Sequence, residues 1–417
     1  MCEEETTSLS DWEQAMMRQA LALALAVEGR TSPRPPVGAV LVRDRQIVGQ
    51  GATAPPYGPH AEALALSEAG PQARGADLYV TLEPCCIALH TPPCTEALIS
   101  AGVRRVVVAA RDPNPQVDGR GLQRLRQAGL VVELLAEDHP LARQARELLR
   151  PFSCLVRLRR PYVTAKWAMT LDGKMAAYTG DAFWISGPQA RAWAHDLRDR
   201  VDAILIGAGT ARRDDPLLTV RLETNSARRP RPQPPRRLVV TSSGLLAPQL
   251  RLLTTPEAGE TWLLLGERVP PERRAALVRP GVRLIEVPCE STGRVDLRLA
   301  LLRLADEGLM HILLEGGAAL TGSAFDCRCI DQVAIVVAPR LIGGASAPVP
   351  LAGQGLPHPG LAATLLNRRV QPLGDDLLIE GQVCYGASLS PVVPATDQLP
   401  WRESEKTGNA SEPSVRD

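Results

Sequence analysis

The sequence predicts an α/β fold in two successive domains, and three features lead to this prediction. The chain has 417 residues, which is more than one ordinary hydrophobic core accommodates. Strand-like and helix-like runs alternate along most of it, as in sheets with helices on their faces. The polar composition of the two ends indicates segments without a core. We therefore expect a flexible start (1–10), a first domain (11–150), a linker (151–160), a second domain (161–388) and a disordered tail (389–417).

Composition excludes several classes of partner. The formal net charge is +1 and aromatic residues make up only 3%, so neither a nucleic acid nor an anionic membrane surface is an expected partner. No apolar run approaches the roughly 20 residues that a membrane-spanning helix needs. The start is polar and acidic, unlike a secretory signal. Nine scattered cysteines suit a reducing compartment, so a cytoplasmic protein is expected.

In the first domain, helix formers at helical spacing predict a helix over 11–28, closed by Gly29. Alternation over 37–51 predicts two strands that meet at Arg43-Asp44-Arg45. Further on, expected helices and strands alternate. The expected helices are 60–70, 95–102, 122–129 and a linking helix at 139–160, and the expected strands are 76–85, 104–113 and 130–136.

In the second domain, apolar and β-branched runs predict a largely buried sheet. The expected strands are 161–170, 201–210 (ending in Gly-rich turns), 236–243, 261–266, 282–288 and 332–344. A helix is expected over 190–201, and residues 311–325 predict a strand, a Gly-Gly turn and a helix. The proline- and arginine-rich stretch 229–237 predicts a solvated loop.

The strongest chemical signal is His60-Ala61-Glu62 followed by Pro84-Cys85 and then Cys94. One imidazole and two thiolates leave a fourth tetrahedral position open, as in catalytic zinc sites. Zinc lowers the pKa of a water molecule, and a carboxylate that is not a ligand then moves protons. Glu62 lies two residues after His60, at the expected start of a helix, and is the predicted proton carrier.

A structural zinc is the alternative. Such a site normally has a fourth protein ligand, and Cys86 or His90 would supply one if the loop between the ligands folded back. Cysteines and histidines are also often structural when they occur singly. Four matching positions in the right order favour the catalytic site.

At these residues the chain resembles the bifunctional deaminase-reductases of riboflavin biosynthesis, from about residue 11 to about 385. The matching stretches are TSPRPPVGAVLV, PHAEALAL, GADLYVTLEPC, TPPCTEALISAGV, RDPNPQVDGRGLQRLRQAG, AKWAMTLDGKMAAYTGD, FWISGPQAR, VDAILIGAGTARRDDPLLTVR, LLEGGAALTGSAF and APRLIGG. Eight residues separate Cys85 from Cys94, whereas the general signature of zinc nucleobase deaminases has two in that place. The long loop is typical of this family.

The resemblance implies a three-layer, cytidine-deaminase-like domain followed by a dihydrofolate-reductase-like domain, with zinc and NADPH as cofactors and a homo-oligomeric assembly. It implies hydrolytic removal of an amino group from a pyrimidine phosphoribosyl substrate, and then NADPH-dependent reduction of the ribosyl group.

The resemblance also implies the site residues of the second domain. The expected substrate contacts are Lys166, Ala182, Arg198, Leu218, Arg221 and Glu315. The expected cofactor contacts are Ala168, Trp184, Thr210, Asp214, Gly317, Ala318, Ala319, Leu320, Thr321, Gly322 and Ser323. Each has an ordinary alternative: a solvated strand lysine, a surface arginine or a core tryptophan. No G-x-G-x-x-G follows a strand, so a Rossmann dinucleotide site is not expected.

The first domain departs from the family at several pocket positions. Arg34 stands where the family has asparagine, Thr53 where it has histidine, and Ile87 and His90 fall in an altered ligand loop. Three hypotheses follow: a bifunctional enzyme in which Arg34 or His90 takes over phosphate or ring contacts, a reductase with a silent or redirected zinc domain, and a binding protein without turnover. A nucleic-acid deaminase is a fourth, and the charge and aromatic content disfavour it. Retention of Glu62, which folding does not require, disfavours the binding protein.

Overall fold

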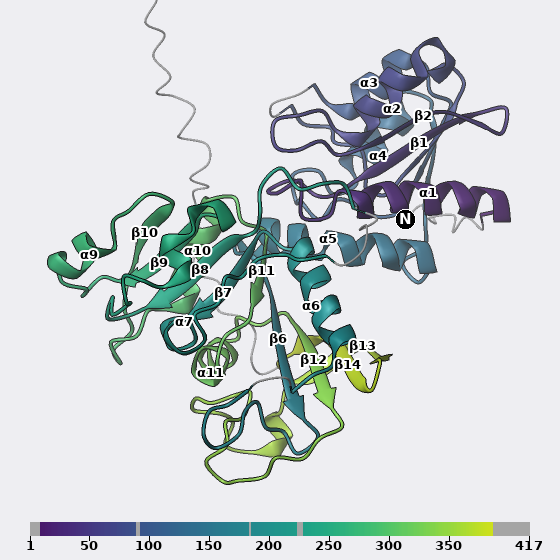
Figure 1. The fold of residues 1–417 in the computed structure, drawn as a ribbon. Helices are drawn as coiled ribbons and strands as arrows, with labels where there is room; N and C mark the ends of the chain where they lie inside the picture. Colours follow the sequence, from purple (N-terminus) through teal and green to yellow (C-terminus); the bar gives the residue numbers. More distant parts are fainter. Residues whose placement is uncertain (1–8, 89–91, 183–184, 223–227, 387–417) are drawn as a thin grey trace, which may run out of the picture.

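The computed structural model describes residues 9–88, 92–182, 185–222 and 228–386 and folds them around two separate sheets (Figure 1). Helices cover both sheets, so the predicted α/β class is confirmed. Among these residues, none of the helices has the length and apolar character required to cross a membrane.

The N-terminal sheet has the strand order β2-β1-β3-β4-β5. Its strands are β1 (Gly38–Arg43), β2 (Gln46–Ala52), β3 (Asp77–Val80), β4 (Arg105–Val108) and β5 (Val131–Leu134). The pairs β2–β1 and β1–β3 are antiparallel, and β3–β4 and β4–β5 are parallel. Asp44 and Arg45 join β1 to β2 with positive φ at both residues, as a tight hairpin requires.

Helices lie on both faces of this sheet, which gives three layers. They are α1 (Asp11–Ala26), α2 (Ala61–Ala69), α3 (Cys94–Ala101), α4 (Arg120–Gln127) and α5 (Pro140–Leu158), with a short 3₁₀ turn at Gly70–Ala73. A Cβ on Gly38 would lie 1.9 Å from the carbonyl oxygen of Ala20 in α1, and one on Gly51 would lie 2.2 Å from that of Ala61 in α2. Gly38 pairs with Ala52, so Gly51 points to the opposite face. The two glycines let one helix approach closely from each side.

The first helix begins where the sequence predicts. The Ser10 side chain accepts a hydrogen bond from Glu13 N (3.4 Å), and the Glu13 carboxylate accepts one from Ser10 N (2.9 Å). The helix ends at Ala26, two residues before the predicted end, and Gly29 follows with a φ of +72°. Beyond Leu9 and Ser10, the expected flexible start lies outside the described residues, as does the expected tail.

The C-terminal sheet has nine strands in the order β10-β9-β8-β7-β11-β6-β12-β14-β13. They are β6 (Tyr162–Thr170), β7 (Ala203–Gly207), β8 (Arg236–Thr241), β9 (Thr261–Gly266), β10 (Val282–Val287), β11 (His311–Leu314), β12 (Gln332–Ala338), β13 (Thr364–Leu373) and β14 (Asp376–Cys384). Pairing is parallel from β10 to β12 and antiparallel for β12–β14–β13. Helices and turns between them are α6 (Pro188–Arg200), α7 (Ala208–Asp214), α8 (Arg251–Thr254), η2 (Pro256–Ala258), α9 (Pro271–Leu277), α10 (Leu297–Asp306), α11 (Ala318–Asp326) and η3 (Pro359–Leu361).

Three features of this domain differ from the sequence prediction. The Gly-rich stretch after β7 is the helix α7, not a turn. The stretch 229–237 is not wholly solvated, because Arg237 lies on β8 between two neighbouring strands and is fully buried, donating to Thr255. The hairpin β13–β14 was missed because β13 is exposed along most of its length and lacks an alternating pattern.

A buried ion pair joins the two domains. Arg30, just after α1, donates from Nη2 to Asp199 Oδ2 of α6 at 2.8 Å, and the two side chains are 5% and 3% exposed. Arg30 also donates to the backbone oxygens of Asp199 and Arg229. Ser32 donates to the carboxylate of Asp202 at 2.6 Å. The segment that leaves α1 is therefore fixed on the C-terminal domain.

Gly322 in α11 packs closely against the backbone of Ala352. A Cβ there would lie 1.2 Å from the carbonyl oxygen of Ala352, so Gly322→Ala must displace one backbone segment. We expect the free energy of unfolding to fall by about 1–3 kcal/mol, as in other overpacked interiors. Urea unfolding followed by circular dichroism measures this loss.

Gly209→Ala is the matched control, because Gly209 is also helical and a Cβ added there would meet no neighbouring segment within 4 Å. Alanine is the better helix former, so this variant should keep or slightly gain stability. Equal losses in both variants would contradict the packing argument.

Candidate metal centre and reductase site

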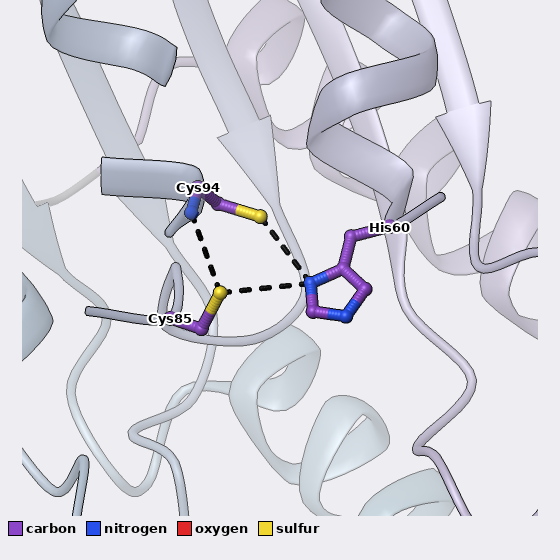
Figure 2. A group of neighbouring side chains, drawn as sticks. All are labelled: His60, Cys85 and Cys94. Atoms are coloured by element: carbon purple, nitrogen blue, oxygen red, sulfur yellow. Dashed lines mark hydrogen bonds between the residues drawn. The ribbon is translucent and has the colours of Figure 1, made fainter. Parts of the chain in front are cut away.

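Three elements of the N-terminal domain bring a histidine and two cysteines together (Figure 2). His60 is the N-cap residue of α2, Cys85 follows β3, and Cys94 is the first residue of α3. His60 Nδ1 lies 3.3 Å from Cys94 Sγ and 3.6 Å from Cys85 Sγ. The backbone nitrogen of Cys94 donates to Cys85 Sγ at 3.3 Å.

These three side chains fit a zinc ion. Their ligand atoms all lie within 4.8 Å of one another, and one imidazole with two thiolates is a usual zinc donor set. A hydrogen bond from the Cys94 side chain, helped by one from His60, lowers the pKa of Cys85 to about 4. The cluster therefore favours a thiolate, which is the form that binds metal.

Glu62 lies in the first turn of α2, two residues after His60. It is 4% exposed, and desolvation by burial, together with the charge of Cys85, raises its pKa to about 7. A carboxyl group with a pKa near neutrality can both accept and return a proton.

Glu83 is a residue of this site that the sequence analysis missed. Its carboxylate is 2% exposed and accepts four backbone hydrogen bonds, from Asp112 (3.2 Å), Gly119 (3.0 Å), Gly121 (2.8 Å) and Leu122 (3.2 Å). These bonds fasten the segment between β3 and Cys85 to the N-terminus of α4. The signal in the sequence is a charged residue within the predicted strand 76–85, two residues before Cys85.

The altered pocket positions have backbone partners. Arg34 donates to the carbonyl oxygens of Gly58 (2.7 Å), Ala54 (3.1 Å) and Pro55 (2.5 Å), in the loop that leads to His60. Its guanidinium thus holds this loop, which differs from the phosphate or ring contacts of the first hypothesis.

Thr53 also uses its side chain to bind the backbone. Its hydroxyl accepts from Val37 N at 3.0 Å, and the residue is buried. Ile87 is half-buried. His90 lies outside the described residues, so neither its expected pocket role nor its alternative role as a fourth ligand receives a structural account.

In the C-terminal domain, the expected substrate residues gather beside β11. Arg198 of α6 forms a two-pronged ion pair with Glu315, Nε–Oε1 at 2.8 Å and Nη2–Oε2 at 2.6 Å. Ala165 pairs with Leu314, so Lys166 lies next to Glu315 on the neighbouring strand. Burial lowers the pKa of Lys166, and the charge of Glu315 opposes this effect.

His195, one turn before Arg198 on α6, is a second residue that the sequence analysis missed. Arg221 lies against its ring, with its backbone nitrogen 3.3 Å from Nδ1 and its Nε 3.4 Å from Nε2. The ring brings Arg221 to the same end of α6 as Arg198. Leu218 is buried in the hydrophobic core beside this group, and Ala182 is exposed.

The expected cofactor residues lie at the carboxyl ends of β7 and β11. Thr210 of α7 accepts a hydrogen bond from Gly317 N at 3.1 Å, which ties the two βα turns together. The run from Ala318 to Ser323 forms the first turns of α11. Asp214 ends α7 and pairs with Arg213.

Two further cofactor positions are expected from the resemblance. Ala168 lies on β6 and packs against the small apolar cluster that contains Val336 and Leu378. Trp184 lies outside the described residues. Adjacent strands whose crossovers lead to different sides form the usual ligand crevice of an open α/β sheet, and β7, β11 and β6 are such neighbours.

Comparison with known proteins matches both domains. Residues 161–379 match the RibD C-terminal domain, and residues 10–110 match the cytidine and deoxycytidylate deaminase zinc-binding region. RibD of Bacillus amyloliquefaciens is 38% identical over 88% of this chain and 95% of its own length. The chain belongs to the RibD family of riboflavin biosynthesis proteins.

Further relatives resemble this chain in sequence or structure over most of its length. RibD of Escherichia coli K12 is 40% identical over 78% of this chain and 87% of its own. Acinetobacter baumannii RibD has a solved structure with a TM-score of 0.75, at 33% identity, covering 89% of this chain and 99% of that one. A Thermotoga maritima structure, titled a diaminohydroxyphosphoribosylaminopyrimidine deaminase/5-amino-6-(5-phosphoribosylamino)uracil reductase, has a TM-score of 0.74 at 30% identity over 89% and 99% of the two chains.

The RibD-family chain is therefore an enzyme of riboflavin biosynthesis with a deaminase domain and a reductase domain. The presence of both matched regions favours the bifunctional interpretation over a reductase alone.

Glu83→Gln tests how the metal centre is held. The amide would place N–H donors against backbone N–H groups, so we expect a loss of about 1–3 kcal/mol in stability and faster loss of zinc to a chelator. Denaturant unfolding and chelator competition with a chromogenic zinc indicator measure the two effects.

Glu96→Gln is the control, because Glu96 also links two helices near Cys94, through an exposed pair with Arg124. It should leave zinc release unchanged. If the Glu83 variant released zinc as slowly as the Glu96 variant, the four backbone hydrogen bonds to Glu83 would not support the metal centre.

Proposed function

We propose that this protein deaminates 2,5-diamino-6-ribosylamino-4(3H)-pyrimidinone 5′-phosphate and then reduces the ribosyl side chain of the product to ribityl with NADPH. The observation that carries the proposal is that one chain holds a three-ligand metal cluster beside a buried carboxyl group and, in a second sheet, a cationic cluster at a strand crossover. The printed title of the Thermotoga maritima relative supports this pair of reactions. We assign the deamination to residues 11–150 and the reduction to residues 161–388.

In the deaminase site, His60, Cys85 and Cys94 would hold one zinc ion per chain. When bound, zinc supplies a Lewis acid that makes water nucleophilic at neutral pH. Glu62 accepts the proton of the attacking water and delivers it to the leaving amino nitrogen, which departs as ammonia. Burial suits this task, because a carboxyl group with a pKa near 7 exchanges protons readily in both directions.

In the reductase site, Lys166, Arg198 and Arg221 would bind the phosphoribosyl substrate, since ammonium and guanidinium groups favour phosphate oxygens. Glu315 orients Arg198 and completes the substrate contacts. Leu218 and Ala182 form the remaining expected contacts.

NADPH would lie along the carboxyl ends of β7 and β11. The N-terminus of α11 offers free backbone N–H groups and a positive dipole end to phosphate. The residues proposed to contact NADPH are Ala168, Trp184, Thr210, Asp214, Gly317, Ala318, Ala319, Leu320, Thr321, Gly322 and Ser323.

A homo-oligomer is part of the proposal. Strand β13 is an edge strand of ten residues, and nearly all of them are exposed, including Leu366 and Val370. A long exposed edge is a template for pairing, and a second copy of the chain would cover it. Sedimentation velocity measures the assembly, and a monomer at micromolar concentration would overturn this part.

The first experiment separates the two reactions. Zinc-loaded protein without NADPH should release ammonia from the diaminopyrimidine substrate, and with NADPH it should oxidise the cofactor on the pre-deaminated substrate. NADPH oxidation without ammonia release would identify a reductase with a silent zinc domain.

Glu62→Gln tests the proton carrier. The amide cannot accept the proton, so ammonia release should fall by roughly 100-fold or more, while zinc content and NADPH oxidation stay unchanged. Glu68→Gln on the same helix, where Glu68 accepts one exposed backbone bond, should leave all three unchanged. Near-normal ammonia release by the Glu62 variant would remove it from the mechanism.

Lys166→Met tests the reductase site. Losing a charged hydrogen-bond donor costs roughly 1.5–3 kcal/mol, so kcat/KM for NADPH-dependent reduction should fall about 10- to 100-fold. Ammonia release by the same preparation is the internal control and should not change. Unaltered reduction kinetics would reject the role of Lys166.

A further inference from the structure

A pair of cysteines in the C-terminal domain lies outside both proposed sites. Cys327 ends α11 as its C-cap residue, and Cys329 follows after one residue. Their sulfur atoms are 3.1 Å apart. We propose that Cys327 and Cys329 form a redox-active dithiol that is converted to a disulfide by small disulfides such as oxidised glutathione.

The close approach results from the way α11 ends. The backbone nitrogen of Arg328 donates to Phe325 O (2.9 Å) and that of Cys329 donates to Ala324 O (2.8 Å). This is a Schellman motif, in which the residue after the C-cap takes a left-handed conformation. Arg328 has a φ of +57°. The reversal folds the chain back so that the cysteines on either side of Arg328 face each other.

The two thiols differ in exposure and in acidity. Cys327 is half-buried, whereas Cys329 is 3% exposed and packs in the core. The hydrogen bond between them lowers the pKa of Cys327, and the charge of Arg298 acts in the same direction. The same hydrogen bond and burial raise the pKa of Cys329. Cys327 is therefore the thiol that a soluble disulfide reaches first.

The thiol–disulfide exchange consumes one molecule of the small disulfide and releases two molecules of its thiol. The Cys327 thiolate attacks one sulfur of the small disulfide, forming a mixed disulfide and expelling one thiolate. Cys329 then gives up its proton to solvent and attacks the sulfur of Cys327, which expels the second thiolate. The protein dithiol loses two electrons, and the small disulfide gains them.

The position of the pair connects it to the reductase site. Helix α11 has nine residues, and its first turn follows Gly317, the residue that donates to Thr210. Arg298 of α10 donates from Nε to the carbonyl oxygen of Cys327 at 3.3 Å. A covalent link at the C-terminus of α11 would fix the cap residue to which Arg298 donates, one helix length from the Gly317–Thr210 contact.

The test uses the zinc-loaded full chain. It is equilibrated with defined ratios of reduced to oxidised glutathione, quenched with N-ethylmaleimide and digested with trypsin without reduction. Trypsin cleaves after Arg328, so the peptides 304–328 and 329–340 stay together only through the disulfide. We expect this linked pair, with loss of alkylation at both cysteines, at glutathione ratios that leave Cys289 alkylated.

Cys329→Ser provides the matched variant. Without the second thiol, it should accumulate a mixed disulfide with glutathione on Cys327, which the wild type resolves. Circular dichroism checks that it folds. Three results with the wild type would each overturn the proposal. The first is full alkylation of both cysteines at glutathione ratios where Cys289 already carries glutathione. The others are a lasting glutathione adduct on Cys327 and a disulfide between Cys327 and another cysteine such as Cys154.

Discussion

The arrangement of both sites depends on the buried ion pair between Arg30 and Asp199. Its charges are almost fully removed from water, so each must be satisfied by a partner of good geometry, and loss of either partner would leave an uncompensated buried charge. Arg228 also bonds to Asp199, at 2.9 Å. The next residue before Asp199 is Arg198, which meets Glu315 in the reductase site. A few residues after Arg30 lies Arg34, which holds the loop before His60. One contact thus sets the starting point for both sites.

The features that sequence analysis predicted well are local ones. The helix start at Ser10 follows from a capping box, the β1–β2 hairpin from alternation and a two-residue turn, and the gathering of His60, Cys85 and Cys94 from the order and spacing of residue types. The first two depend on residues close together in the chain, whereas the cluster joins two short motifs that lie 34 residues apart at their ends. The match to a family then added the residues whose roles no local pattern reveals.

The features that the sequence analysis missed depend on contacts or exposure that only the folded chain reveals. Arg237 looks like part of a solvated basic loop, yet its strand lies inside the sheet, and its Nη2 donates to carbonyl groups of the segment after α8. Strand β13 has no alternating pattern because both of its faces are exposed. Glu83 looks like an ordinary charged residue in the sequence, but in the fold it accepts hydrogen bonds from the first backbone N–H groups of α4, which have no partner within the helix. The partners of Arg237 and Glu83 lie 18 or more residues along the chain, whereas β13 pairs with the strand that follows it and lacks only the pattern that burial would impose.

Two glutamates, Glu62 and Glu315, show how environment assigns chemistry to one residue type. Glu62 is buried beside a thiol cluster, and desolvation raises its pKa to about 7, so it can exchange a proton near neutrality. Glu315 is half-buried, and Arg198 forms two hydrogen bonds to it while Lys166 lies close by, so its pKa falls to about 2 in spite of desolvation. A carboxylate that remains ionised cannot carry protons at neutral pH, although it can hold cationic side chains in place. The presence or absence of an opposing cation therefore separates proton transfer in the first site from positioning in the second.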